Sequence, residues 1–420
     1  MSVATIPGQV TPTAPPPDRA SFSMRLWMWP VLVLVVLSVT RLVTGADDIS
    51  SSGTLKAALV SAIPIALAGL GGLWAERAGV VNIGLEGMMI LGTLGAGYYT
   101  YHLGIWVGIL GAVAFGAIGG VLHAIATVVF NVDHIVSGVA INIIAAGTAA
   151  FLAEQFFSGL PGGGPTQSPS LDKPPTITIP GLDDLSSDLA DKRWFLISDL
   201  SAFVNSLVSG MSVFTLLALA LIFGTGWVLW KTAFGLRLRS CGESPTAAET
   251  LGVNVYRYKF LAVTISGMFA GLGGAYLTLV ASSGYQNGST NGKGYIGLAA
   301  MIFGNWRPGG LLTGSLLFGY TEGARLRSGG ESVHALLLIV VVALLVLAVW
   351  QIRKQRVLSA LIAAGVGALG LVWYLSVDEI PGDFTEMTPY VVTLLVLAVA
   401  SQRLRMPAAD GLRYRKGRAG

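Results

Sequence analysis

The chain has 420 residues, of which 53% are hydrophobic and 11% are charged, and its formal net charge is +4. An average soluble domain carries about 25% charged residues, so this composition excludes a disordered chain, a coiled coil and a soluble nucleic-acid binder. The mean hydropathy of +0.69 indicates a polytopic membrane protein. The 55 glycines fit, because small residues let membrane helices approach closely. A single cysteine excludes a disulfide framework.

Residues 1–24 are polar and proline-rich and lack the apolar core of a signal peptide, which predicts a disordered cytosolic tail. A helix needs about 20 mostly apolar residues to span a bilayer. Such runs occur throughout residues 25–402, which we predict to be the transmembrane domain. The last part of this domain, residues 357–402, contains two additional spans. The predicted spans are Leu26–Val43, Leu55–Trp74, Leu85–Tyr101, Gly104–Phe130, Ile135–Phe157, Gly210–Trp230, Phe260–Ser282, Leu311–Leu326, Ser332–Trp350, Val357–Leu375 and Pro389–Ser401.

Gly294–Trp306 is only about half a span, which predicts a short tilted or re-entrant helix. The predicted fold is therefore all-α: a polytopic transmembrane helical bundle of about 10–12 spans with broken or re-entrant helices.

Lysine and arginine predict the orientation, because they gather on the cytoplasmic side of a membrane. The loop 231–259, the turn 351–356 and the tail 403–420 are basic, so we place them in the cytosol. The insertion 158–209, predicted to be a surface loop, and the loop 377–387 are acidic and belong outside. This gives about twelve crossings with both termini cytosolic. Arg325 and Arg327 then lie near an outer end, against the rule.

The basic loop contains the strongest local motif. Ser244 suits a helix N-cap, Pro245 the first helical position and Gly252 the residue after the end, which predicts a helix over Pro245–Leu251. Its small side chains surround one larger residue, Leu251. A helix of two turns is marginal alone in water, so we expect it to dock on another surface. The alternative is a capped connector that rests on its own bundle.

Four polar residues inside the predicted spans are candidates for a solute pathway. A carboxylate in the membrane is costly and faces a cavity or a partner, which singles out Glu86. Asn82 would share a helix face with it, being four residues away. The alternative is that Glu86 holds a turn or caps a helix. Ser137 and Asn142 could contact a solute or bond a neighbouring helix.

Asp133 is predicted to cap the helix that starts at His134 or Ile135. The four histidines are scattered without a partner at metal-ligand spacing, so we expect no metal site, and we find no catalytic motif. Gly288–Gly294 departs from the phosphate-loop pattern at several positions, so we do not expect this chain to hydrolyse ATP.

Three segments together resemble one family: ERAGVVNIGLEGMMILG, FGLRLRSCGESPTAAETLGVNVYRYKFLAVTISGMFAGLGGAYL and GKGYIGLAAMIFGNWRPGG. They are similar to the permease subunits of bacterial ABC importers for nucleosides and simple sugars, which are related to the ribose and branched-chain amino-acid permeases. The resemblance covers roughly residues 51–350. It implies a multi-pass subunit of the bacterial plasma membrane that moves nucleosides, or simple sugars, inward by alternating access.

The resemblance also implies partners and an ATPase-coupling segment. The partners would be an ABC ATPase that holds ATP and magnesium, a second permease forming a paralogous heterodimer, and an extracellular substrate-binding lipoprotein. This chain itself would need no cofactor and would not be an enzyme. The coupling residues would be Gly242, Glu243, Pro245, Ala247, Ala248, Leu251 and Gly252. The alternative function is an ion-coupled secondary transporter, for which Glu86 is the plausible coupling residue.

Overall fold

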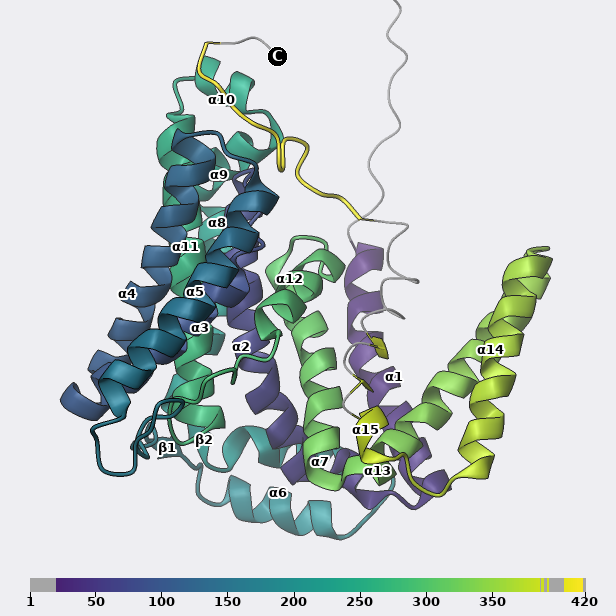
Figure 1. Cartoon of the computed structure of the whole chain (residues 1–420). Coiled ribbons are helices and arrows are strands. Elements are labelled where there is room, and N and C mark those ends of the chain that lie inside the picture. Colours follow the sequence, from purple (N-terminus) through teal and green to yellow (C-terminus); the bar gives the residue numbers. More distant parts are fainter. Residues whose placement is uncertain (1–19, 386, 389–390, 393–403, 418–420) are drawn as a thin grey trace, which may run out of the picture.

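The computed structural model describes residues 20–417 apart from 386, 389–390 and 393–403, and most of this part of the chain is helical (Figure 1). Two short strands, β1 and β2, pair antiparallel. Seven helices in the described part are long and apolar enough to cross a membrane. The predicted all-α polytopic bundle is therefore confirmed.

The elements follow one another with short connections, apart from a long segment between α5 and α8. They are α1 (Ala20–Thr44), α2 (Ser52–Arg77), α3 (Leu85–Leu103), α4 (Ile105–Ala124), α5 (His134–Phe157), β1 (Thr176–Ile177), α6 (Leu182–Asp191), α7 (Ile197–Val208), β2 (Met211–Ser212), α8 (Val213–Lys231), α9 (Ala233–Glu243), α10 (Pro245–Thr250), α11 (Val255–Tyr276), α12 (Lys293–Phe303), α13 (Pro308–Arg353), α14 (Val357–Ser376) and α15 (Gly382–Thr385). One 3₁₀ turn (Asp47–Ser50) precedes α2, and π-helical turns extend α4 to Val129 and α11 to Ala281.

Helix α2 forms the centre of the bundle, because it packs against α11, α12 and α13. Every residue from Ser61 to Glu76 is buried. Glycines permit this close packing: a Cβ on Gly71 would lie 2.5 Å from the backbone oxygen of Ser266 in α11. Small residues on α2 thus bring the backbones of its neighbours into contact, as in other membrane bundles.

Helix α12 is a half-length helix of 11 residues. At 1.5 Å per residue it measures about 16 Å, roughly half of the hydrocarbon core. The chain then turns through Asn305 and Trp306, which have φ angles of +55° and +53°, and enters α13. The short helix predicted within Gly294–Trp306 is therefore present.

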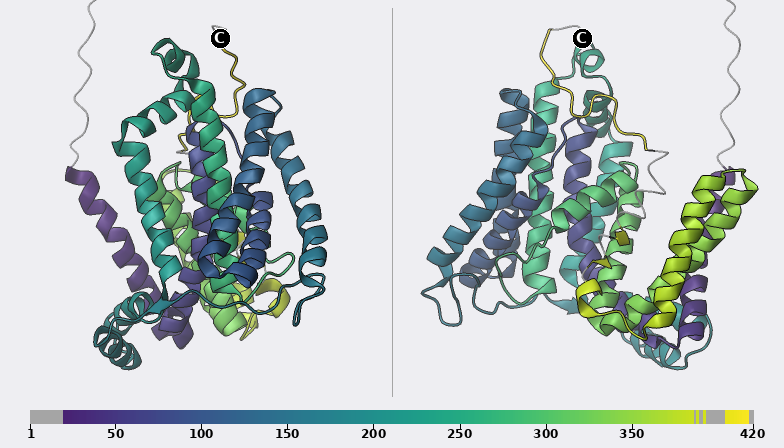
Figure 2. Two further views of the ribbon diagram at one scale, coloured as in Figure 1. Left: turned by 90° about the vertical axis from the view of Figure 1, so that its left-hand side faces the viewer. Right: turned by 45° about the vertical axis from the view of Figure 1, so that its right-hand side comes forward.

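The predicted spans Leu311–Leu326 and Ser332–Trp350 are the two arms of α13. The helix bends sharply at Gly329, where φ is +55° and ψ is −123°. The second arm packs against α14, and Figure 2 shows this pair standing apart from the rest of the bundle.

The two ends of the bundle carry the segments that the charge pattern assigned to opposite sides. α9, α10 and residues 404–417 lie at the upper end in Figure 1, and the α13–α14 turn points the same way. α6, α7, α15 and the β1–β2 pair lie at the lower end. The basic and acidic segments of the described chain are thus sorted to opposite ends.

The insertion 158–209 differs from the predicted surface loop, because it contains the two helices α6 and α7. Its abundance of glycine, proline and serine hid the apolar face of each helix. Asp199 anchors α7: its carboxylate accepts hydrogen bonds from Ser38 and Ser50 and lies 3.3 Å from the Arg41 guanidinium of α1. These buried polar contacts tie the insertion to the first helix.

The count of about twelve crossings stays a prediction. α1 begins at Ala20, so residues 20–24 of the predicted tail are helical, while residues 1–19 lie outside the described part. α14 provides the first of the two predicted C-terminal spans, and the second, Pro389–Ser401, lies mostly outside it.

Candidate functional site

A non-helical linker, residues 78–84, connects α2 to α3 inside the bundle. Asn82 is fully buried there; its amide nitrogen donates to the Ser266 hydroxyl at 2.8 Å and its oxygen accepts from Gly84 N at 3.0 Å. Because α3 begins only at Leu85, Asn82 and Glu86 do not share a helix face, and that prediction is wrong. The Asn82 side chain instead fixes the turn that leads into α3.

Glu86 joins α3 to the start of α12. Its two carboxylate oxygens accept hydrogen bonds from the backbone N–H groups of Gly292 at 2.9 Å and Gly294 at 2.7 Å. The first N–H groups of a helix lack intrahelical partners and favour a negative charge, so a carboxylate here caps α12. Of the two roles considered for Glu86, helix capping is the one for which the structure supplies contacts.

Asn142 and Ser137, both on α5, secure the other side of the linker. Asn142 accepts from Gly87 N at 2.7 Å and donates to Ile83 O at 3.0 Å and to the Tyr295 hydroxyl at 2.8 Å. Ser137 bonds the ring of His123 at 2.8 Å. Both side chains thus link neighbouring segments.

The four predicted pathway residues therefore surround one structure, which we call the polar junction: the linker 78–84 with the starts of α3 and α12. They are buried and bonded to protein groups. Tyr295, which the sequence analysis missed, is 46% exposed and connects Asn142 to the bundle surface. A lining role for the four stays a prediction, and Tyr295 is the member of the junction that can reach a solute.

At the upper end, α10 closely matches the helix predicted over Pro245–Leu251, since it ends one residue earlier. Pro245 occupies its first turn, and Gly252 follows its end with φ +82° and donates to Glu249 O at 2.9 Å. Ser244 holds the N-cap position, but its side chain makes no capping hydrogen bond. Asp133 does cap α5 as predicted, accepting from Ile135 N at 2.9 Å.

The predicted coupling residues divide between two faces of the α9–α10 segment. Leu251 is 84% exposed, and Ala247 and Glu243 also face outward. Ala248 and Gly242 point inward; a Cβ on Gly242 would lie 2.4 Å from Arg77 O. The first group can meet a partner, whereas the second positions the segment on its own bundle.

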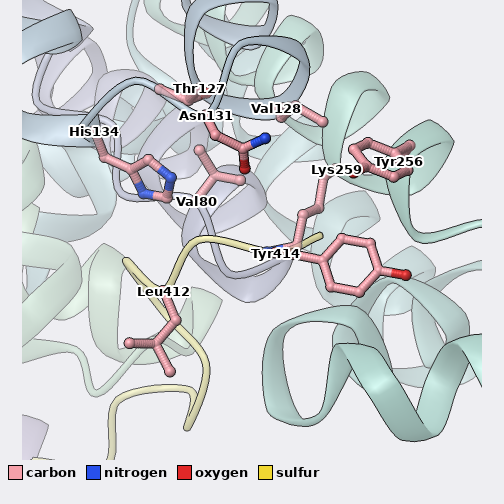
Figure 3. A pocket seen from close by; sticks show the side chains of 9 residues that line it. All are labelled: Val80, Thr127, Val128, Asn131, His134, Tyr256, Lys259, Leu412 and Tyr414. Carbon is pink, nitrogen blue, oxygen red and sulfur yellow. The ribbon is translucent and has the colours of Figure 1, made fainter. Parts of the chain in front are cut away.

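Residues 404–417, which we call the C-terminal strap, were predicted only as part of a basic tail, yet they pack along this segment. Ala409 N donates to Gly242 O at 2.8 Å, and the Tyr414 hydroxyl donates to the Glu249 carboxylate at 2.6 Å. Figure 3 shows Leu412 and Tyr414 at a small pocket with Lys259 of α11. The strap thus ties α10 to the ends of other helices.

Two titratable groups are buried at the strap. Cys241 packs with Tyr414, and burial raises the pKa of its thiol to about 11, so the thiol is protonated and shielded. Burial likewise raises the pKa of Asp410 to about 7. The Asp410 carboxyl lies beside the Glu76 carboxyl. Two carboxylates this close in a buried site are not both ionised, so the pair holds a shared proton.

A polytopic helical bundle with a half-length helix beside a buried polar junction is typical of membrane transport proteins. The sequence profile described as "Branched-chain amino acid transport system / permease component" matches residues 54–349. The chain belongs to this permease family.

Similar proteins include permeases of Bacillus subtilis and Lactococcus lactis. The chain is 34% identical to the guanosine ABC transporter permease protein NupQ of Bacillus subtilis, over 87% of this chain and 97% of that one. It is 31% identical to the nucleoside ABC transporter permease protein NupC of Lactococcus lactis, over 86% and 96%. It is 26% identical to the guanosine ABC transporter permease protein NupP of Bacillus subtilis, over 69% and 80%. No solved structure matches the chain.

Proposed function

We propose that this chain is a permease subunit of an ATP-driven ABC importer that carries nucleosides inward by alternating access. The observation that carries the proposal is α10: a proline-started helix at one end of the bundle with Leu251 84% exposed. A helix this short is marginal alone in water, and it protrudes with an apolar side chain at its tip, which favours a docking partner. The names of NupQ and NupC favour nucleosides over simple sugars as the solute.

The partners follow from the same reasoning. An ABC ATPase, which holds ATP and magnesium, docks on α10, and its two states bind α10 differently, which shifts the permease between its conformations. The second permease is a paralogous chain, because NupQ and NupP are two guanosine permeases of one bacterium. A substrate-binding lipoprotein delivers the solute at the opposite end.

The orientation in a bacterial plasma membrane places α10 and both termini in the cytosol. The sorting of basic segments to the α10 end supports it, because lysine and arginine gather on the cytoplasmic side. Arg325 forms a salt bridge with Glu322 at 2.8 Å, which offsets its charge near the outer end.

Ion-coupled transport has weaker support. The coupling candidate, Glu86, has both oxygens engaged by backbone N–H groups, so proton or sodium binding would compete with the cap of α12. The permease relatives also favour the ATP-driven alternative.

Uptake into proteoliposomes that contain the assembled complex and the binding protein tests the proposal. We expect labelled guanosine to accumulate only with ATP on the α10 side, and an excess of unlabelled ribose not to compete. Uptake driven by a proton or sodium gradient without ATP would contradict it.

A substitution tests the docking role of α10. Ala247→Arg places a long charged side chain on its outer face and is expected to lower ATP-dependent uptake at least tenfold while the protein still folds. Gln355→Arg, an equally bulky change at an exposed position of the α13–α14 turn, is the control and should leave uptake unchanged. Normal uptake by Ala247→Arg would contradict the assignment.

A further inference from the structure

The C-terminal strap crosses the upper end of the bundle and contacts three turns in succession. Arg405 N donates to the Asn305 side chain in the α12–α13 turn at 2.7 Å. Ala409 lies against the linker after α2, where a Cβ on Gly79 would be 3.1 Å from its backbone oxygen. Ala408 N donates to the Glu243 carboxylate at 3.2 Å, at the junction of α9 and α10. These contacts, spread along the strap, fix its course across the upper end of the bundle.

One side chain of the strap forms the inner wall of α10. Tyr414 is 8% exposed and packs with Cys241, Ala248 and Val255, and its hydroxyl bonds Glu249. Its ring also lies 5.3 Å from that of Tyr256, centroid to centroid. Without Tyr414, the inner face of α10 would lose this apolar contact, so the position of α10 depends on the strap.

The neighbours of Tyr414 face the other way. In an extended chain successive side chains point to opposite sides, and Arg413 and Arg415 are exposed on either side of the buried Tyr414. Lys416 is exposed as well, and its backbone N–H donates to the Tyr256 hydroxyl at 3.4 Å. Arg413 interacts electrostatically with Asp133 at the start of α5. The strap therefore presents a basic surface directly beside α10.

We infer that the ATPase-docking surface of this permease is composite: the outer face of α10 inserts Leu251 into an apolar pocket, and Arg413, Arg415 and Lys416 of the strap pair with an acidic rim of that pocket. Figures 1 and 2 show the strap ending beside α10 at the extreme upper end of the bundle, where one partner surface can contact both. The inference rests on the proposed function and adds a second docking element, outside residues 54–349 matched by the family profile.

Charge reversal tests the basic half of the surface. In the triple variant Arg413→Glu, Arg415→Glu, Lys416→Glu, we expect the Mg-ATP hydrolysis that co-purifies per permease at physiological salt to fall at least tenfold. The matched control is Arg353→Glu, Lys354→Glu, Arg356→Glu, which reverses three exposed charges in the α13–α14 turn on the same side. The control should retain the ATPase. Raising the salt should weaken the parent complex more than the triple variant, because exposed charge pairs are screened.

Cys241 reports whether the strap stays seated in the variant. The thiol is buried beneath Tyr414, so its labelling by a maleimide is slow while the strap is in place. If the reversal speeds labelling, the neutral set Arg413→Gln, Arg415→Gln, Lys416→Gln replaces it. Loss of ATPase with Cys241 still protected supports the inference, and full retention of ATPase overturns it.

Ala247→Arg separates this inference from the proposed function. If Ala247→Arg releases the ATPase and the strap variants keep it, α10 docks alone and only the composite surface is wrong. If no ATPase accompanies even the parent chain and ATP does not drive uptake, the proposed function itself fails.

Discussion

Two buried carboxylates in this permease have equal exposure and different surroundings. Glu86, in the polar junction, and Asp410, in the C-terminal strap, are each 7% exposed. Glu86 accepts hydrogen bonds from two backbone N–H groups at the start of α12. Asp410 lies beside the Glu76 carboxyl, and burial raises the pKa of Asp410 to about 7.

The comparison shows that burial alone does not decide what a carboxylate does. Where donors converge, the charge becomes a fixed tie between segments that are more than 200 residues apart in sequence, as with Glu86 and Gly292. Where a second carboxyl lies alongside, as Glu76 does beside Asp410, the contact depends on a proton. The hydrogen bonds of Glu86 therefore hold the polar junction together, whereas a change of pH near neutrality can weaken the contacts of the strap.

Removing the Glu86 carboxylate should have the largest effect. Glu86→Ala leaves two buried N–H groups without acceptors, and we expect it to lower the free energy of unfolding by about 3 kcal/mol. Glu86→Gln retains one oxygen and should cost less. Thermal unfolding of the purified protein in detergent measures both, with Glu154→Ala, at an exposed position of α5, as the control. Equal stability of Glu86→Ala and the control would refute the capping role.

The close approach of α12 to α3 provides a second test. A Cβ on Gly294 would lie 2.6 Å from Glu86 Cα, so Gly294→Ala should force the junction apart and cost about 2 kcal/mol. Gly309→Ala, in α13, meets nothing within 4 Å and should be neutral or slightly stabilising. A stable, fully active Gly294→Ala protein would show that α12 is less tightly seated than described.

Asp410→Asn tests the proton dependence of the strap. Because the pKa of Asp410 is raised to about 7 in the seated strap, its contribution to seating is fully present below about pH 4 and is lost as the pH rises through 7. Asparagine does not titrate, so at pH 8 we expect Cys241 labelling to be at least tenfold slower in the variant than in the parent, because the pKa shift of Asp410 exceeds one unit. The ratio should approach one only below about pH 4. A ratio independent of pH would contradict the assignment.

Tyr414→Phe should have the smallest effect of the four. It removes one hydrogen bond to a carboxylate, worth about 1 to 1.5 kcal/mol, and keeps the ring that packs on Ala248. We expect Cys241 labelling to accelerate about fivefold to tenfold. Tyr258→Phe, which removes the hydroxyl of a tyrosine in α11, is the control. No acceleration would mean that the ring alone holds the strap.

Local signals in the sequence predicted several features well. Ser244, Pro245 and Gly252 placed α10 to within one residue, and Asp133 placed the start of α5, because capping and turn chemistry act over a few residues. The shortness of the apolar run Gly294–Trp306 predicted the half-length α12. These features need no knowledge of distant segments.

The sequence could not predict contacts between distant segments. The partners of Glu86 lie 206 and 208 residues later, and no periodicity links them. The sequence predicted only a basic tail where the strap lies. Tyr414 is a single aromatic residue among charged ones, so nothing in the pattern indicated that it packs against α10. The helices α6 and α7 were hidden by composition. In each case the deciding interaction was tertiary.

The strap also has a consequence for how the protein is made. The Tyr414 side chain that supports α10 is added 165 residues after Glu249. At about 5 to 20 residues per second, a ribosome takes about 10 to 30 seconds to cover that distance. During this interval α10 lacks its support, so nascent and prematurely terminated chains carry α10 without the strap side chain that packs on its inner face.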